Sequence, residues 1–183
     1  MEDYHPSDEL SDDEKPAEPP QGILIANEQR LMPVDEDRLR CAVQAVLDDA
    51  AIHSAMISIA VVNDAASHAI NHRYLQHDWP TDILSFVLEN EGDHLEGELV
   101  ASAETALKMA DRYGWTPAEE LLLYVIHGAL HLVGYRDKAP EETAQMRAAE
   151  QQVLRQLGVT LPADHERPAL SVSEAARGES PTS

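Results

Sequence analysis

The feature that most constrains the fold is a long apolar stretch between Thr116 and Gly134 that contains two histidines. Thr116 followed by Pro117 is typical of a helix start, and Gly134 is typical of a helix end. Nearly every position between them is apolar, so the predicted helix has no polar side to turn towards solvent. Any fold of this chain therefore has to bury this helix.

His127 and His131 lie four positions apart in this stretch, so on a helix their imidazoles lie one turn above each other and can bind one metal ion. Two buried imidazoles need partners, and a metal would satisfy both. Gly134 can turn the chain back beneath the pair, which brings Asp137 near the place of a third ligand. The alternative is two core histidines hydrogen-bonded to neighbours, with Asp137 in a surface turn. Spacing alone does not decide between these interpretations.

A second histidine pair, His68 and His72, has the same spacing and serves as an internal control. With nine histidines in the chain, such a pair is expected by chance with a probability of about one third. The two pairs differ in their surroundings, because only the first lies in an apolar helix. We therefore interpret His68 and His72 as part of a solvated helix face.

Apolar runs and helical spacing alternate along the chain. Short apolar runs predict strands at residues 23–26, 56–62, 83–88 and 97–101. Helical spacing and start and stop residues predict helices from Asp35 to Leu47, from Asp64 to Leu75, and at residues 102–113, 116–133 and 140–157. Asp64 is the predicted cap of the second of these helices. Strands that alternate with helices and then give way to a run of helices predict an α+β fold around a small sheet.

The charge of the chain is uneven and divides it into three parts. Residues 1–20 contain eight acidic residues, one basic residue and four prolines, which predict a disordered acidic tail. Residues 162–183 are rich in Ser, Ala, Pro and Gly and predict a flexible C-terminal tail. The single folded domain predicted between them, residues 21–161, has 22 acidic and 10 basic residues. This balance argues against a broad basic surface for nucleic acid.

The sequence limits where the protein is expected to be located and which residue types could bind a metal. It has no apolar run of the roughly 18 to 20 residues that a membrane span needs, and its first residues are acidic where a leader would be basic. We therefore expect a cytoplasmic protein without a membrane partner. Cys41 is the only cysteine, so a metal site would have to use histidines and carboxylates.

Two blocks of the sequence resemble a known family. The stretch from His127 to Asp137 resembles the HGxLHLxGYDH motif of the YbeY family. The members of this family are zinc-dependent, single-strand-specific endoribonucleases that act in ribosomal RNA maturation. Upstream, Asn71 and residues 78–86 resemble the N…DxPTDVLSF block of the same family. Two blocks in the right order are more specific than either alone. The likeness spans about residues 57–150 and implies a small mixed sheet of about four strands flanked by helices, with both histidines on a central helix.

The resemblance implies a function and a set of site residues. The protein would be a metal-dependent endoribonuclease for single-stranded or ribosomal RNA, acting in rRNA maturation and ribosome quality control. His127, His131 and Asp137 would hold one Zn²⁺ per chain, and metal-bound water or hydroxide would promote phosphodiester cleavage. Ribosomal proteins or ribosomal subunits would be its other partners, and no DNA substrate is expected.

The sequence departs from the family pattern at two positions. The third ligand of the family is a histidine, whereas this chain has Asp137, which lowers the net charge of the site by one unit. We predict a weaker Lewis acid and some preference for Mn²⁺ or Fe²⁺ over zinc. The family arginine that handles phosphate is replaced by Leu75. Arg73 and Arg136 are the candidate catalytic substitutes, with Lys138 as a further phosphate partner.

The general base is not assigned by the sequence. Zinc proteases with the HExxH motif use the glutamate after the first histidine, and this chain has Gly128 there, which disfavours peptide hydrolysis. We also expect Gly128 to leave room above the metal for a bulky substrate. Asp82, Ser85 and Glu98 are candidate bases. The alternative function is a non-enzymatic, ribosome-associated metal-binding protein with the same fold.

Overall fold

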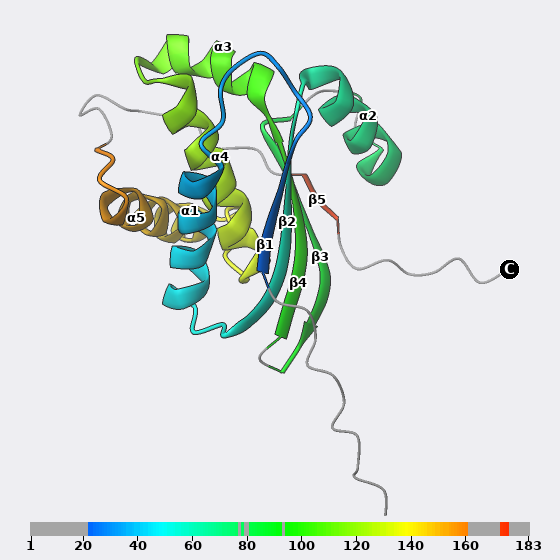
Figure 1. The fold of residues 1–183 in the computed structure, drawn as a ribbon. Coiled ribbons are helices and arrows are strands. Elements are labelled where there is room, and N and C mark those ends of the chain that lie inside the picture. Colours follow the sequence, from blue (N-terminus) through cyan, green and yellow to red (C-terminus); the bar gives the residue numbers. More distant parts are fainter. Residues whose placement is uncertain (1–21, 77, 79–80, 93, 161–172, 176–183) are drawn as a thin grey trace, which may run out of the picture.

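A mixed sheet with helices on both faces organises the protein (Figure 1). The computed structural model describes residues 22–76, 78, 81–92, 94–160 and 173–175. In chain order the elements are β1 (Gly22–Asn27), α1 (Glu36–Asp49), β2 (Ser54–Val62), α2 (Asp64–Leu75), β3 (Ile83–Glu91), β4 (His94–Ser102), α3 (Ala103–Tyr113), α4 (Pro117–Leu132), α5 (Pro140–Gln156) and β5 (Ser173–Ala175).

The strand order is β1-β2-β4-β3-β5. Strands β1, β2 and β4 are parallel, whereas β3 runs antiparallel to β4 and parallel to β5. The predicted α+β fold with a mixed sheet of about four strands is confirmed in β1 to β4. Strand β5 was not predicted, because three residues carry no readable alternation. The predicted acidic tail lies outside the described residues, and the division into three parts stays a prediction.

All four predicted strands are longer than the sequence predicted, and β3 and β4 differ most. Strand β4 begins at His94 and not near Gly97, and β3 continues to Glu91. In the first half of β4, buried Leu95 and Gly97 alternate with partly exposed polar residues, so the continuous apolar run begins only at Leu99. The polar ends of both strands pair with each other, which the apolar pattern could not show.

Helices cover the two faces of the sheet unequally, and we call these faces the thick side and the thin side. On the thick side, α1 and α4 pack against the sheet and α5 packs against both helices (Figure 1). On the thin side, α2 covers a smaller apolar cluster formed by Val62, Leu84 and Val100. Every residue of α4 from Glu120 to Leu132 is buried, which confirms that the histidine-bearing helix is central.

The residues that begin and end α4 are those that the sequence predicted, whereas the residue that caps α2 is a different one. Thr116 forms a capping box with Glu119, and Gly134 has a φ of +100° just after the helix. The predicted cap of α2, Asp64, is wrong, because Asn63 is the cap and its side chain accepts a hydrogen bond from the Ala66 amide. The Asp64 carboxylate instead binds side chains of α3, which join α2 to α3.

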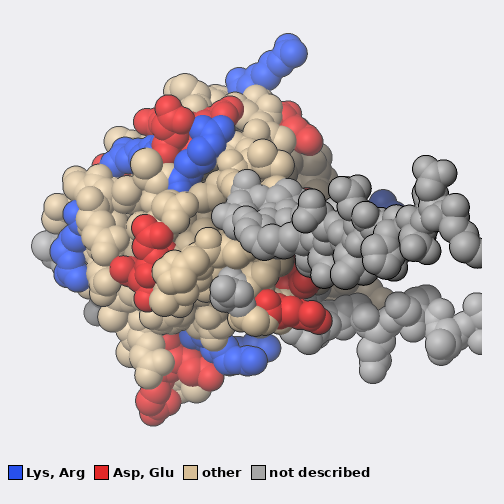
Figure 2. Space-filling view, turned by 60° about the horizontal axis from the view of Figure 1, so that its bottom comes forward, with Lys and Arg blue, Asp and Glu red and all other residues tan. Residues whose placement is uncertain are grey.

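Acidic and basic side chains are intermixed on the described part of the face in Figure 2, where no basic area extends across the surface. Within α1, Arg40 pairs with Glu36 and Asp37. Within the described parts of the chain, no helix combines the length and apolar character that a membrane crossing requires.

Candidate metal centre

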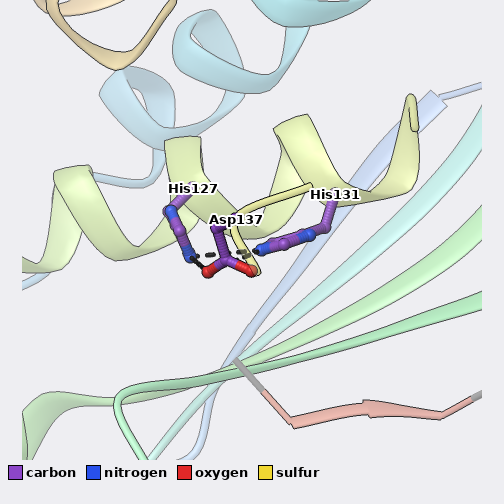
Figure 3. Close-up of side chains that lie close together, drawn as sticks. All are labelled: His127, His131 and Asp137. Carbon is purple, nitrogen blue, oxygen red and sulfur yellow. Dashed lines mark hydrogen bonds and ion pairs between the residues drawn. The ribbon is translucent and has the colours of Figure 1, made fainter. Parts of the chain in front are cut away.

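The two histidines of α4 lie side by side inside the protein (Figure 3). His127 is 2% exposed and His131 is 5% exposed. Their Nε2 atoms are 3.2 Å apart, and the two rings are nearly perpendicular, with an angle of 84° between their planes. The helical spacing therefore aims both imidazoles at one point, as the sequence predicted.

The loop after α4 brings the third side chain to this point. The Gly134 amide donates to the carbonyl of His131, and the Tyr135 amide donates to the carbonyl of Leu130, so the helix ends and the chain reverses. Asp137 then points its carboxylate at the two imidazoles (Figure 3). Helix α5 also holds this loop, because the Thr143 hydroxyl donates a hydrogen bond of 2.8 Å to the backbone carbonyl of Asp137.

The two distances from the Asp137 carboxylate to the imidazoles fit a shared metal better than direct hydrogen bonds. Oδ2 of Asp137 lies 3.6 Å from Nε2 of His127 and 3.7 Å from Nε2 of His131, which is too long for hydrogen bonds. A tetrahedral zinc ion, with ligands about 2.0 to 2.1 Å away, separates its ligand atoms by about 3.3 Å. The three side chains are the one group in the described residues whose donor atoms meet within 4.8 Å in this way. The donor set and its spacing therefore fit a divalent metal.

A glutamate on α5 contacts the site from behind. Oε1 of Glu150 lies 2.6 Å from Nδ1 of His127, and Glu150 is 9% exposed. Sequence reasoning missed this residue. A signal was present, since Glu150 occupies the same helix face as Met146 and Val153, both buried, and an acid on a buried face needs a partner.

Gly128 has a different role from the one predicted. A Cβ atom at this position would lie 2.7 Å from Cδ1 of Ile83 and 2.9 Å from Cδ2 of Leu99. The missing side chain therefore allows α4 to approach the sheet, and the expectation that it opens space above the metal is wrong. A glutamate at position 128 would collide with the sheet, so this position cannot supply the base of an HExxH protease.

The three candidate bases occupy different environments. Asp82 is buried and accepts hydrogen bonds from the Ile83 amide and the Thr81 hydroxyl. Burial raises the pKa of its carboxyl more than these hydrogen bonds and nearby His127 lower it. The Ser85 hydroxyl donates to the backbone carbonyl of Gly128. Glu98 alternates with Leu99 on β4, so its side chain points to the side of the sheet opposite α4.

The candidate phosphate-binding residues are also separated. Arg136 is exposed and directly precedes Asp137 in the loop. Arg73 is exposed on α2, on the other side of the sheet, with its guanidinium 5.4 Å from the Tyr74 ring centre. Leu75 packs against the apolar cluster of the thin side, which explains an apolar residue at this position. The structure thus brings only Arg136 next to the metal-binding loop, and both catalytic roles stay predictions.

The control pair differs from the site, as expected. His68 is half-buried, His72 is exposed, and their ring centres are 6.4 Å apart. Nε2 of His68 lies 3.0 Å from an exposed carboxylate oxygen of Asp78. These contacts are those of a solvent-facing helix side.

The fold and the site define a small α+β protein with a candidate metal centre of two histidines and a carboxylate on its central helix. The sequence profile of one family, described as Endoribonuclease YbeY, matches residues 24–158. The chain belongs to this family, and the relatives named below are RNA-cleaving hydrolases by name.

Several of these relatives are similar to the chain over most of its folded part. Endoribonuclease YbeY of Rhodopirellula baltica is 48% identical over 108 residues, which are 58% of this chain and 56% of that protein. The chain thus aligns with little more than half of that relative's length. The enzymes of Carboxydothermus hydrogenoformans and Moorella thermoacetica are 37% and 34% identical over 139 and 150 residues, each covering 74% of this chain and 96% of the relative.

A solved structure supports the architecture. The solution structure of a Thermotoga maritima protein superposes with a TM-score of 0.53 and 22% sequence identity. The superposition covers 79% of this chain and 100% of that one. At this level of identity the likeness shows the fold alone.

Proposed function

We propose that this protein is a metal-dependent endoribonuclease that cleaves single-stranded RNA in ribosomal RNA maturation and ribosome quality control. The observation that carries the proposal is the convergence of His127, His131 and Asp137 on one point, in a member of an endoribonuclease family. The cytoplasm is the proposed location, with ribosomal proteins or subunits as partners.

Three protein donors leave one coordination position of a tetrahedral metal for water or substrate. A divalent metal, when bound there, supplies positive charge for a phosphoryl oxygen and lowers the pKa of water towards neutral. The two imidazoles contribute neutral donors, and Asp137 contributes one negative charge. This donor set suits Zn²⁺ and also accommodates Mn²⁺ or Fe²⁺, which accept carboxylate ligands more readily than thiolates.

Other residues would handle phosphate and protons. Arg136 is the better-supported phosphate ligand, because it neighbours Asp137 in the loop, and Arg73 is the second candidate. Asp82 is the better-supported proton acceptor, since its carboxyl is buried with a raised pKa and interacts electrostatically with His127.

The acidic character of the domain shapes how RNA would bind. Intermixed charges, as on the described part of the face in Figure 2, offer little general attraction for a polyanion, so RNA affinity would depend on the metal and a few arginines near it. Ribosomal partners would then raise the local concentration of the substrate. We expect free RNA to be cleaved slowly and RNA within ribosomal particles to be cleaved faster.

A cleavage assay tests the proposal directly. Structured RNA with single-stranded tails is incubated with added Zn²⁺ or Mn²⁺ and either wild type, His131→Ala or His72→Ala, the last being a matched control from the solvent-facing pair. We expect cleavage within the tails by wild type and His72→Ala, and loss of at least about a hundredfold in rate for His131→Ala. Equal rates for wild type and His131→Ala would refute metal-dependent cleavage at this site.

A second candidate function is a non-enzymatic, ribosome-associated metal-binding protein. Two observations favour it, namely apolar packing of Leu75 where the family has a phosphate-handling arginine, and Asp137 in place of the third histidine. Metal-dependent binding to ribosomal subunits without cleavage of their RNA would support this candidate over the nuclease.

A further inference from the structure

We propose that Glu150 is a positioning residue for the candidate metal centre, holding His127 in the orientation and tautomer that present its Nε2 lone pair to a metal. The inference rests on the proposed function only in assuming that the site binds a metal. It assigns a role to α5, which contributes none of the three candidate ligands.

A metal binds a neutral imidazole through the ring nitrogen that carries no proton. Such a ring has one N–H donor and one lone pair, and the hydrogen bond at one nitrogen decides which nitrogen is free to bind a metal. A carboxylate accepts hydrogen bonds and donates none. With Oε1 of Glu150 2.6 Å from Nδ1 of His127, the proton belongs on Nδ1, which leaves the lone pair on Nε2.

The Nε2 lone pair of His127 points at the other two donors of the site. Nε2 of His127 faces Nε2 of His131 at 3.2 Å and Oδ2 of Asp137 at 3.6 Å. The nitrogen that Glu150 keeps free is therefore the one that points at the other two donors. Without this contact, His127 would populate both tautomers, and one of them carries its proton on the nitrogen that should bind the metal.

The packing of α5 explains why Glu150 can hold His127 firmly. Met146, Val153 and Leu154 are each 1% exposed, so this stretch of α5 is anchored in the core. Glu150 is four residues after Met146 and three before Val153, which places it on the same buried face. A rigid helix is a better support for an oriented contact than a solvent-exposed loop.

The same helix also supports the loop that carries Asp137. Thr143 lies two turns before Glu150 on α5, and its hydroxyl donates to the carbonyl of Asp137. Glu142 accepts hydrogen bonds from the amides of Lys138 and Ala139 in the same loop. One helix thus fixes His127 through its side chain and Asp137 through its backbone.

The test compares Glu150→Gln with Glu141→Gln, a matched change at an exposed position of α5. Zn²⁺ affinity is measured by competition with a chromogenic chelator, and the tautomer of His127 by ¹⁵N imidazole NMR on the metal-free protein. We expect Glu150→Gln to lower Zn²⁺ affinity by about 10- to 100-fold and to change the His127 tautomer from Nδ1–H to a mixture, with Glu141→Gln unaffected. Glu150→Asp, which keeps the carboxylate, should recover part of both properties.

A Glu150→Gln protein that keeps either the wild-type affinity within about twofold or the wild-type tautomer overturns the proposal. Thermal unfolding checks that each variant is folded, and if Glu150→Gln is not, Glu150→Asp carries the same comparison with a smaller expected change. The tautomer is read without metal or RNA, so a failure of the nuclease proposal leaves this result interpretable. Absence of RNA cleavage by wild type would count against the proposed function and not against the role of Glu150.

Discussion

Oδ2 of Asp137 lies 3.6 Å from Nε2 of His127, too far for a hydrogen bond and close to the spacing of two ligands on one metal. The same oxygen lies 3.7 Å from Nε2 of His131. In the sequence, Asp137 stands where the motif that this chain resembles has a third histidine, and in the structure its carboxylate lies beside both imidazoles. The candidate site thus has three donors, one of which is a carboxylate.

Replacing Asp137 with histidine should shift metal preference. Asp137→His restores a neutral third ligand, so we expect tighter binding of Zn²⁺ relative to Mn²⁺, by about tenfold, and a more acidic bound water. Competition titrations with both metals measure the first effect, and the pH dependence of RNA cleavage measures the second. Unchanged metal preference together with an unchanged pH profile would show that Asp137 is not a ligand.

Adding a methyl group at Gly128 should destabilise the protein. A Cβ atom there would lie 2.7 Å from Cδ1 of Ile83, so Gly128→Ala is expected to cost about 1 to 3 kcal/mol in free energy of unfolding. Ile83→Val removes that Cδ1 atom, and the double variant should recover part of the loss. Urea unfolding of the two single variants and the double variant gives the coupling energy. Additive effects would contradict the close contact between α4 and β3.

Asp64 should contribute stability that is lost in acid. Burial raises the pKa of its carboxyl, but hydrogen bonds from Lys108, Ser102 and Thr105 outweigh this and leave the folded-state pKa below the usual value. A carboxyl with a lowered folded-state pKa stabilises the protein above its unfolded pKa of about 3.9, and this contribution disappears as pH falls through the folded-state value.

Asp64→Asn should therefore be less stable than wild type at pH 7, because it loses the charge-assisted hydrogen bonds from the Ser102 and Thr105 hydroxyls and the ion pair with exposed Lys108. The difference between the two proteins should shrink as pH falls below about 4. Urea unfolding at several pH values measures it, with Asp111→Asn at an exposed site of α3 as control. A difference that stays constant with pH would contradict the assignment.

The two candidate arginines should differ in their effect on cleavage. Arg136 lies in the loop beside Asp137, whereas Arg73 lies across the sheet from α4. We expect the larger loss, about tenfold or more in cleavage rate, from Arg136→Ala. Arg155→Ala, on the exposed side of α5, controls for the loss of one positive charge. A larger loss from Arg73→Ala would place the RNA along α2 instead.

Most of the helices and strands could be predicted from the sequence, because the residue patterns that delimit them are local. Thr116, Pro117 and Gly134 delimit α4 through capping and turn chemistry that needs only neighbouring residues. The spacing of His127 and His131, with Gly134 after them, likewise places two imidazoles and the returning loop. The turn at Gly134 also indicated Asp137 as a third ligand, and the resemblance to the family favoured a metal site over two hydrogen-bonded core histidines.

The contacts that sequence reasoning missed join residues far apart in the chain. Glu150 meets His127 from another helix, and Gly128 meets Ile83 across the boundary between helix and sheet. Neither pair has a periodicity that links its members, so only the packing of α4 against its neighbours reveals them. The choice of Asn63 over Asp64 as the cap of α2 has the same origin, because α3 engages the Asp64 side chain.

We expect His127, His131 and Asp137 to form one three-ligand metal site. Elemental mass spectrometry of wild type and Asp137→Ala, both purified without chelator or affinity tag, tests it most directly. We predict about one metal ion per chain in wild type and less than about a tenth of that in the variant. Equal metal contents in the two proteins, or no metal in wild type, would contradict the claim.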